Sequence, residues 1–291
     1  MATLRELRKR LSSISITKQL ASAMKTVSAA KYAKLETLRG RYLPYADTCS
    51  ALMTAYGEAM TGFLPCINPE APSLYIVFAS NRGLCGGYNS ELFRYAETVL
   101  AAEEKPYRLF VCGKMATSYF GDRAAESFLL PDVPDFADCL PLFDRIRALY
   151  TAGEVSRVMF VFAHFQNMLT QVPCSRTVLP YADTGSTETT ESSEAHTSAA
   201  YPATEKPDIL FFPNRETVLS GACLSLLHVT MYSIVLEACS GAQAATLIAM
   251  RSANDNAAET AARLEIEISR KRQAEVTSSV IETASGMHRE S

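Results

Sequence analysis

The two ends of the chain carry hydrophobic residues at the spacing of long helices, and neither end contains an early helix-breaking proline. The first proline is Pro44 and the last is Pro213, which leaves 43 residues before and 78 residues after without one. At a rise of about 1.5 Å per residue, these ends predict helices of about 65 and 115 Å. A compact domain of this length is only about 40 Å across, so such helices must extend beyond it.

The N-terminal segment predicts a helix with a seam for a partner helix. The first half of the seam steps by three and four residues, through Leu4, Leu7, Leu11 and Ile14. This is the a/d spacing of a coiled coil. After a slip in phase near Ile16, the seam resumes with Leu20, Met24 and Val27. Pro44 is expected to bend or interrupt the helix, which then continues to about residue 60.

The middle of the chain has a different period. Residues 74–78, 108–112 and 158–162 are short, continuous apolar runs, as buried strands are. Helical patterns over 92–100 and 143–150 separate them. The alternation predicts a central, Rossmann-like α/β domain over residues 73–182. Residues 183–206 are rich in Thr, Ser and Glu and predict a flexible polar loop.

The C-terminal helix is expected over residues 214–287 and has two parts. Residues 217–236 hold no charged side chain, which is long enough for a membrane span. Gly221, His228 and several hydroxyl groups interrupt that run, so a helix packed on the sheet is the preferred interpretation. Beyond Met250 the pattern is amphipathic, with acidic and basic residues alternating at four-residue spacing and an apolar stripe marked by Leu264 and Ile268. The fold class predicted is therefore α/β, with residues 1–43 and 216–284 paired as a long antiparallel coiled coil.

The charge is distributed unevenly. Residues 1–41 contain ten Lys and Arg against two Glu, a local charge of +8 in a chain whose net charge is −3. A basic helix on an acidic body predicts an acidic partner, either nucleic acid, a membrane surface or a protein. Aromatic residues are scarce in this segment, which argues against nucleic acid. The eight cysteines show no CxxC spacing and indicate buried, reduced thiols.

The short motif that stands out is the glycine-rich segment 83–89, directly after the first strand. A strand-to-helix turn of this kind can bind a phosphate through backbone N–H groups. It matches neither GxGxxG nor GxxxxGK[ST], so the structural interpretation, in which Gly86 and Gly87 permit a tight turn, is preferred. No GxSxG or HExxH motif is present, and the four histidines are far apart in the chain. We therefore expect no catalytic residue, no metal and no cofactor.

Taken together, the motifs resemble the gamma subunit of F-type ATP synthases. Residues 6–31 resemble the family's opening helix, and Ser80 to Asn89 resemble its signature loop almost letter for letter. Segments 243–250, 255–256 and 272–277 fall in register near the C-terminus. The chain departs from the family at Ala242 and Thr246, where Glu and Arg are usual, and at Ser279, where Glu is usual. Its C-terminal tip, residues 285–291, is polar where the family ends in small apolar residues.

The resemblance implies a central rotor shaft that couples proton flow through a membrane c-ring to the catalytic cycling of the beta subunits. It implies contacts with three alpha and three beta subunits, the epsilon subunit and the c-ring, no nucleic acid, and a peripheral place on the cytoplasmic face of a bacterial inner membrane. The interaction residues that it implies are Met24, Lys25, Lys31, Arg82, Gly83, Cys85, Gly86, Asn89, Arg272, Gln273, Thr277 and Glu282. Two alternatives stay open: a static adaptor of the same fold, and a nucleotide-binding α/β enzyme that uses the glycine loop.

Overall fold

The computed structural model describes residues 3–60, 67–180, 212 and 214–287. The side chains at 43, 46–47, 49–60, 215 and 282–287 are not part of this description. The chain divides into two compact units, one of residues 1–29 and 246–291 and the other of residues 30–245. The predicted loop 183–206 lies outside the described residues, and so do residues 288–291 of the polar tip.

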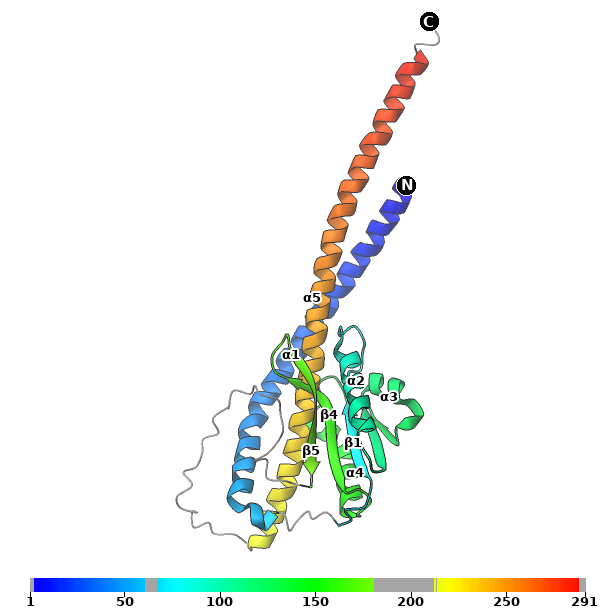
Figure 1. Cartoon of the computed structure of the whole chain (residues 1–291). Helices are drawn as coiled ribbons and strands as arrows, with labels where there is room; N and C mark the ends of the chain where they lie inside the picture. The colour runs from blue at the N-terminus through cyan, green and yellow to red at the C-terminus, as the bar shows by residue number, and fades with distance from the viewer. Residues whose placement is uncertain (1–2, 61–66, 181–211, 213, 288–291) are drawn as a thin grey trace. The chain divides into compact units, whose positions relative to one another are not determined.

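The larger unit contains a mixed sheet of five strands in the order β3-β2-β1-β4-β5. Strands β1, β4 and β5 are labelled in Figure 1. Strands β1 (Ser73–Phe78), β2 (Tyr107–Cys112), β3 (Glu126–Phe128) and β4 (Arg157–Phe165) are parallel, and β5 (Gln171–Leu179) pairs with β4 in the antiparallel sense. The three apolar runs of the sequence form β1, β2 and β4. This confirms the predicted α/β fold class.

Helices cover both faces of the sheet, which is why β1 is buried throughout and carries a continuous apolar run from Leu74 to Phe78. Tyr75 and Val77 face helices α2 (Tyr88–Ala101) and α3 (Lys114–Phe120), where they pack with Leu92 and Phe120. The alternate residues of β1 pack on the opposite face against α4 (Phe136–Thr151) and the two long helices. A strand buried on both faces needs a continuous apolar run rather than an alternating one. A short 3-10 helix η1 (Gly121–Arg123) connects α3 to β3.

Helices α1 (Leu4–Met60) and α5 (Arg215–Met287) contribute their inner parts to this second face. Leu35 of α1 and Met231 and Val235 of α5 are buried in the same cluster as Ile76 and Phe160. Helix α5 is long and apolar enough to cross a membrane by length and composition, and half of its most apolar window is buried in the protein. The preferred interpretation of the uncharged run, a helix packed on the sheet, is confirmed.

The outer parts of α1 and α5 form the smaller unit, and the two segments run in opposite directions (Figure 1). On α1 the inward positions recur every seven residues, at Leu7, Ile14, Ala21 and Ser28. On α5 the buried Met250, Ala257 and Leu264 keep the same period. A strict seven-residue repeat is the pattern of a left-handed coiled coil.

The predicted seam of α1 was wrong at two of its later positions, although Met24 is half-buried. Leu20 and Val27 are exposed, and Ala21 and Ser28 take the inward positions. The heptad begun by Leu7 continues without a slip, but small residues occupy it. Small side chains let two helix backbones approach closely, so they mark the seam here better than the larger residues beside them.

Pro44 was expected to bend or interrupt the helix, and an interruption is ruled out because α1 continues through it as one helix. Proline removes one backbone hydrogen bond and its ring crowds the carbonyl four residues earlier. That carbonyl belongs to Gly40, an exposed residue. The lost hydrogen bond therefore falls at an exposed position of the helix.

Six described cysteines are free thiols, namely Cys85, Cys112, Cys139, Cys174, Cys223 and Cys239. Burial raises the pKa of Cys139 and of Cys239 to about 12. Such thiols stay protonated at neutral pH and behave as small apolar side chains. Cys49 and Cys66 are outside the description.

The burial of His228 predicts that the stability of the fold depends on pH. Its ring stacks near Phe143 and lies edge-on to Phe136, and within the described part of the chain its buried Nε2 has no hydrogen-bond partner. Burial lowers the pKa of His228, while Asp144 opposes and Arg147 assists the shift to a smaller extent. Protonation of His228 therefore opposes folding. The loss of stability begins as the pH falls through about 6.5, the pKa of histidine in the unfolded chain.

We expect the variant His228→Phe to lose less stability than the parent chain between about pH 7.5 and pH 5.5. Urea denaturation of both full-length chains at the two pH values measures the difference, and groups that titrate equally in both chains cancel. An equal loss in both chains would show that His228 carries no part of the acid sensitivity.

Candidate functional site

The glycine loop between β1 and α2 is organised by one buried side chain, Asn89. Its Oδ1 accepts the backbone N–H of Ser80 at 3.2 Å, and its Nδ2 donates to Ser80 Oγ at 2.7 Å and to Cys85 Sγ at 3.1 Å. The Ser80 hydroxyl donates to the Arg82 carbonyl at 2.6 Å. The polar groups on the inside of the turn therefore bond to one another. Asn89 therefore joins the two ends of the loop, which is a role that the sequence did not specify.

Backbone conformation explains part of the glycine content. Gly86 has a φ of 61°, and Leu84 also lies in the left-handed region at 65°. Gly87, by contrast, has a φ of −79° and precedes α2 as its N-cap residue. Any residue can adopt this φ, so the tight turn needs the conformational freedom of glycine at Gly86 and not at Gly87. A Cβ on Gly83 would meet nothing within 4 Å, so the structure sets no steric demand for glycine there.

A second network ties this loop to helix α1. Lys31 Nζ forms an ion pair with Asp132 Oδ2 at 2.5 Å, and Asn81 Nδ2 donates to Asp132 Oδ1 at 3.0 Å and to the Leu130 carbonyl at 2.7 Å. Asn81 Oδ1 accepts the backbone N–H of Lys114 at 3.2 Å. Asp132 therefore joins α1 and the signature loop, and the loop is joined in turn to the start of α3.

The electrostatics of Asp132 support this role. Burial alone would raise the pKa of its carboxyl, but the hydrogen bonds from Lys31 and Asn81 and the charges of Lys31 and Arg82 hold it below its ordinary value. The carboxylate is thus charged at neutral pH and stabilises the positions of Lys31 and of Asn81, which precedes Arg82 in the chain. A group with a lowered pKa loses this contribution only when the pH falls towards about 4.

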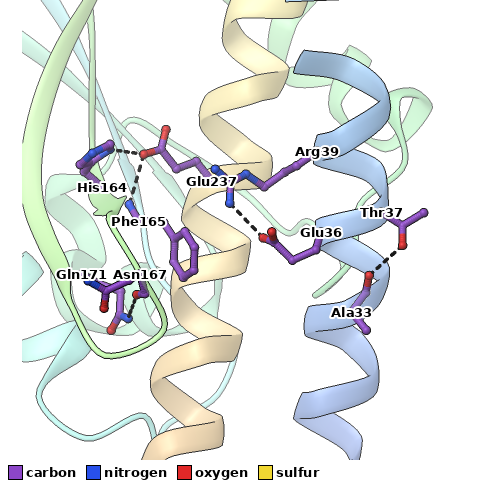
Figure 2. Close-up of polar contacts among 9 residues, drawn as sticks. All are labelled: Ala33, Glu36, Thr37, Arg39, His164, Phe165, Asn167, Gln171 and Glu237. Carbon is purple, nitrogen blue, oxygen red and sulfur yellow. Dashed lines mark hydrogen bonds and ion pairs between the residues drawn. The ribbon is translucent and has the colours of Figure 1, made fainter. Parts of the chain in front are cut away.

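The β4–β5 hairpin contacts both long helices through a second set of polar side chains (Figure 2). Glu237 of α5 bonds to the His164 ring and accepts the Phe165 backbone N–H at 3.1 Å. Arg39 of α1 pairs with Glu36 at 2.9 Å and places its guanidinium 5.2 Å from the centre of the Phe165 ring. Asn167 and Gln171 close the hairpin through side-chain bonds to its backbone.

Burial would raise the pKa of Glu237, but the hydrogen bond from His164, the charges of Arg176 and His164 and the Phe165 N–H together lower it. The buried carboxylate is therefore charged and held from more than one side. No group of three or more potential metal ligands occurs among the described residues.

The structure places the predicted residues in two regions. Lys31, Arg82, Cys85 and Asn89 belong to the larger unit and lie in or beside the two networks at the glycine loop. Met24 and Lys25 are half-buried on α1 in the smaller unit. Arg272, Gln273 and Thr277 are exposed on α5, where the Thr277 hydroxyl donates to the Gln273 carbonyl at 2.8 Å. The side chain of Glu282 lies outside the description.

Sequence reasoning missed Asp132, His164 and Glu237 as parts of these networks. Asp132 is 101 residues from Lys31, and His164 is 73 residues from Glu237. No short motif marks any of the three. The only available signal was Glu237 itself, a single charge at the end of a 20-residue uncharged run.

Comparison with known proteins places this geometry in a family. Residues 3–288 match the family model described as ATP synthase. The ATP synthase gamma chain of Granulibacter bethesdensis is 30% identical and aligns with 98% of this chain and 99% of its own length. The gamma chain of Desulforamulus reducens is also 30% identical, with 98% of each chain covered.

Solved structures share the fold. A chain in a structure of the Euglena gracilis mitochondrial ATP synthase, comprising OSCP, F1 and c-ring, aligns with a TM-score of 0.65 at 17% identity and covers 98% of this chain and 93% of its own. A chain from the Tetrahymena thermophila central stalk and c-ring aligns with a TM-score of 0.57 at 17% identity, over 80% of this chain and 99% of its own. The sequence matches over nearly the full length, together with this fold, show that the chain belongs to the ATP synthase gamma chain family.

Proposed function

We propose that this chain is the central rotor shaft of an F-type ATP synthase. It couples proton flow through a membrane c-ring to the conformational cycle of the catalytic beta subunits. The observation that carries the proposal is the full-length match to gamma chains in a protein whose two ends form a coiled-coil unit. As a gamma chain it is a non-catalytic subunit, and its role is mechanical.

The proposed partners are three alpha and three beta subunits around the shaft, with the epsilon subunit and the c-ring at the α/β domain. The exposed basic residues of α1, among them Arg5, Arg8 and Lys18, support an acidic protein partner. The similar ATP synthase gamma chains include proteins from several bacteria. We therefore place the chain peripherally on the cytoplasmic face of a bacterial inner membrane.

The predicted interaction residues divide between two tasks in this proposal. Met24 and Lys25 with Arg272, Gln273, Thr277 and Glu282 belong to the shaft that the ring of subunits surrounds. Lys31, Arg82, Gly83, Cys85, Gly86 and Asn89 belong to the glycine loop and its connection to α1. The internal hydrogen bonds of that loop favour a structural role for it over a nucleotide site.

The glycine loop can be tested by one substitution and a matched control. Gly86→Ala should lower the free energy of unfolding by about 1–3 kcal/mol, because a side chain is strained at a positive φ. Gly83→Ala in the same loop should change it little, since a Cβ there meets nothing within 4 Å. Chemical denaturation measures both, and isothermal titration with ATP tests the alternative. A saturable ATP site that is lost in Gly86→Ala while the fold is retained would favour the nucleotide-binding enzyme.

The shaft can be tested at Arg272, which is exposed on α5. A hydrogen bond from an arginine to a partner carboxylate contributes about 1.5–3 kcal/mol. We expect Arg272→Ala to reduce ATP synthesis by about tenfold or more in reconstituted complexes and to leave the melting temperature of the chain unchanged. Arg270→Ala removes the same charge from another face of the helix and is the control.

Ser279, where the family usually has Glu, should tolerate alanine with little effect on synthesis. If Arg272→Ala and Arg270→Ala both synthesise ATP at the parental rate, the proposed contact at Arg272 is wrong. If the unmodified chain fails to assemble with alpha and beta subunits, the rotor proposal itself is wrong.

A further inference from the structure

One turn of α5, residues 237–241, is held to the α/β domain by directed contacts. Neighbouring residues of α5 such as Leu227, Met231 and Val235 pack against the sheet through apolar side chains. Apolar burial resists separation but has no preferred direction. Hydrogen bonds weaken steeply when their angle changes. On this stretch Tyr232 also donates a hydrogen bond to the Pro134 carbonyl at 3.0 Å. The turn at 237–241 adds directed contacts from other elements of the domain to this packing.

Glu237 makes the first of these contacts. The residue is 9% exposed. Its Oε1 forms hydrogen bonds with the Nδ1 of the His164 ring and with the Phe165 backbone N–H. Two consecutive residues of β4 thus hold one carboxylate oxygen. Figure 2 shows the Glu237 side chain extending from α5 to these two residues. Removal of the carboxylate charge would leave the Phe165 N–H and the His164 ring with a weaker acceptor.

Tyr88 makes the second contact, from the first residue of α2. Its buried hydroxyl donates to the Ala238 carbonyl at 3.0 Å. Gly241, one turn further along α5, faces the same part of the domain. A Cβ at that position would lie 3.4 Å from Gln171 Cγ and from Tyr88 Cε2, and 3.6 Å from the Ala163 carbonyl oxygen. Strand β4, strand β5 and helix α2 therefore all reach the same turn.

Phe165 extends this contact to α1. Its backbone bonds to Glu237, and its ring lies 5.9 Å from the Tyr32 ring and 5.2 Å from the Arg39 guanidinium, measured to its centre. A guanidinium over an aromatic ring at this distance is attracted to it. One residue of β4 thereby contacts both long helices.

We propose that Tyr88, Phe165 and Glu237 form the joint that transmits torque between the α/β domain and the two long helices. The inference rests on the rotor function proposed above. The three residues are positioning residues, because they touch no substrate. A torque that turned the domain about the α5 axis would have to break the Tyr88 and Glu237 contacts together, since both join different elements of the domain to the same helical turn.

The test uses complete ATP synthase complexes in membrane vesicles, each containing the full chain. The variants are Tyr88→Phe, which removes one hydroxyl, and Glu237→Gln, which removes the charge and keeps the size. The control is Tyr95→Phe, on the same helix as Tyr88. The Tyr95 hydroxyl pairs with Ser175 Oγ at 3.2 Å, a contact within the α/β domain that does not involve α5. Proton pumping per ATP hydrolysed is the measurement, with the melting temperature of each complex recorded beside it.

We expect pumping per ATP hydrolysed to fall about two- to fivefold in Tyr88→Phe and Glu237→Gln and to match the parent in Tyr95→Phe. Pumping at the parental level in all three variants would refute the proposed joint. This holds even if Tyr88→Phe and Glu237→Gln melt at lower temperature, because Tyr88 and Glu237 would then contribute to stability alone. If Glu237→Gln does not assemble, Tyr88→Phe alone decides, since it preserves the buried ring. An unmodified chain that gives no coupled pumping would refute the rotor function instead.

Discussion

One face of the central sheet is closed only when the inner parts of the two long helices cover it. Ile76 and Phe160 on that face share a buried cluster with Leu35 of α1 and Met231 and Val235 of α5. Burial of each such side chain contributes about 1.5–3 kcal/mol relative to exposure. The helices cannot separate from the domain without exposing this core. The inner parts of α1 and α5 are therefore joined to the α/β domain by a shared hydrophobic core.

The same helices must then serve two different environments along their length. In the larger unit they present large apolar residues to a sheet, and in the smaller unit they present a heptad seam to each other. Small residues such as Ala21, Ser28 and Ala257 occupy much of that seam. A seam of small residues buries little area per position, so it contributes less stability than a leucine seam would. Exposed Ile16, Leu20 and Ile266 beside it are available to subunits that would surround the shaft.

Local patterns were enough to predict the elements that are regular. Continuous apolar runs identified β1, β2 and β4, because strands buried on both faces carry no polar alternation. Strand β3 is three residues long and β5 is half exposed, so neither has such a run. At the glycine loop, the motif indicated the turn and Asn89, both of which depend on residues close in sequence. Asp132 and His164 depend on partners far away in the chain, and nothing in their neighbours marks them.

The departures from the family at Ala242 and Thr246 can be understood from the packing around the same turn of α5. Ala242 is buried in a small cluster with Cys85, Tyr88 and Ala163. A glutamate in such a place needs a paired charge, because an isolated buried carboxylate costs several kcal/mol. Thr246 carries no positive charge to supply it. The chain makes a close contact at this position through alanine packing instead. The Tyr88 hydroxyl bond to Ala238 adds a directed contact to that packing.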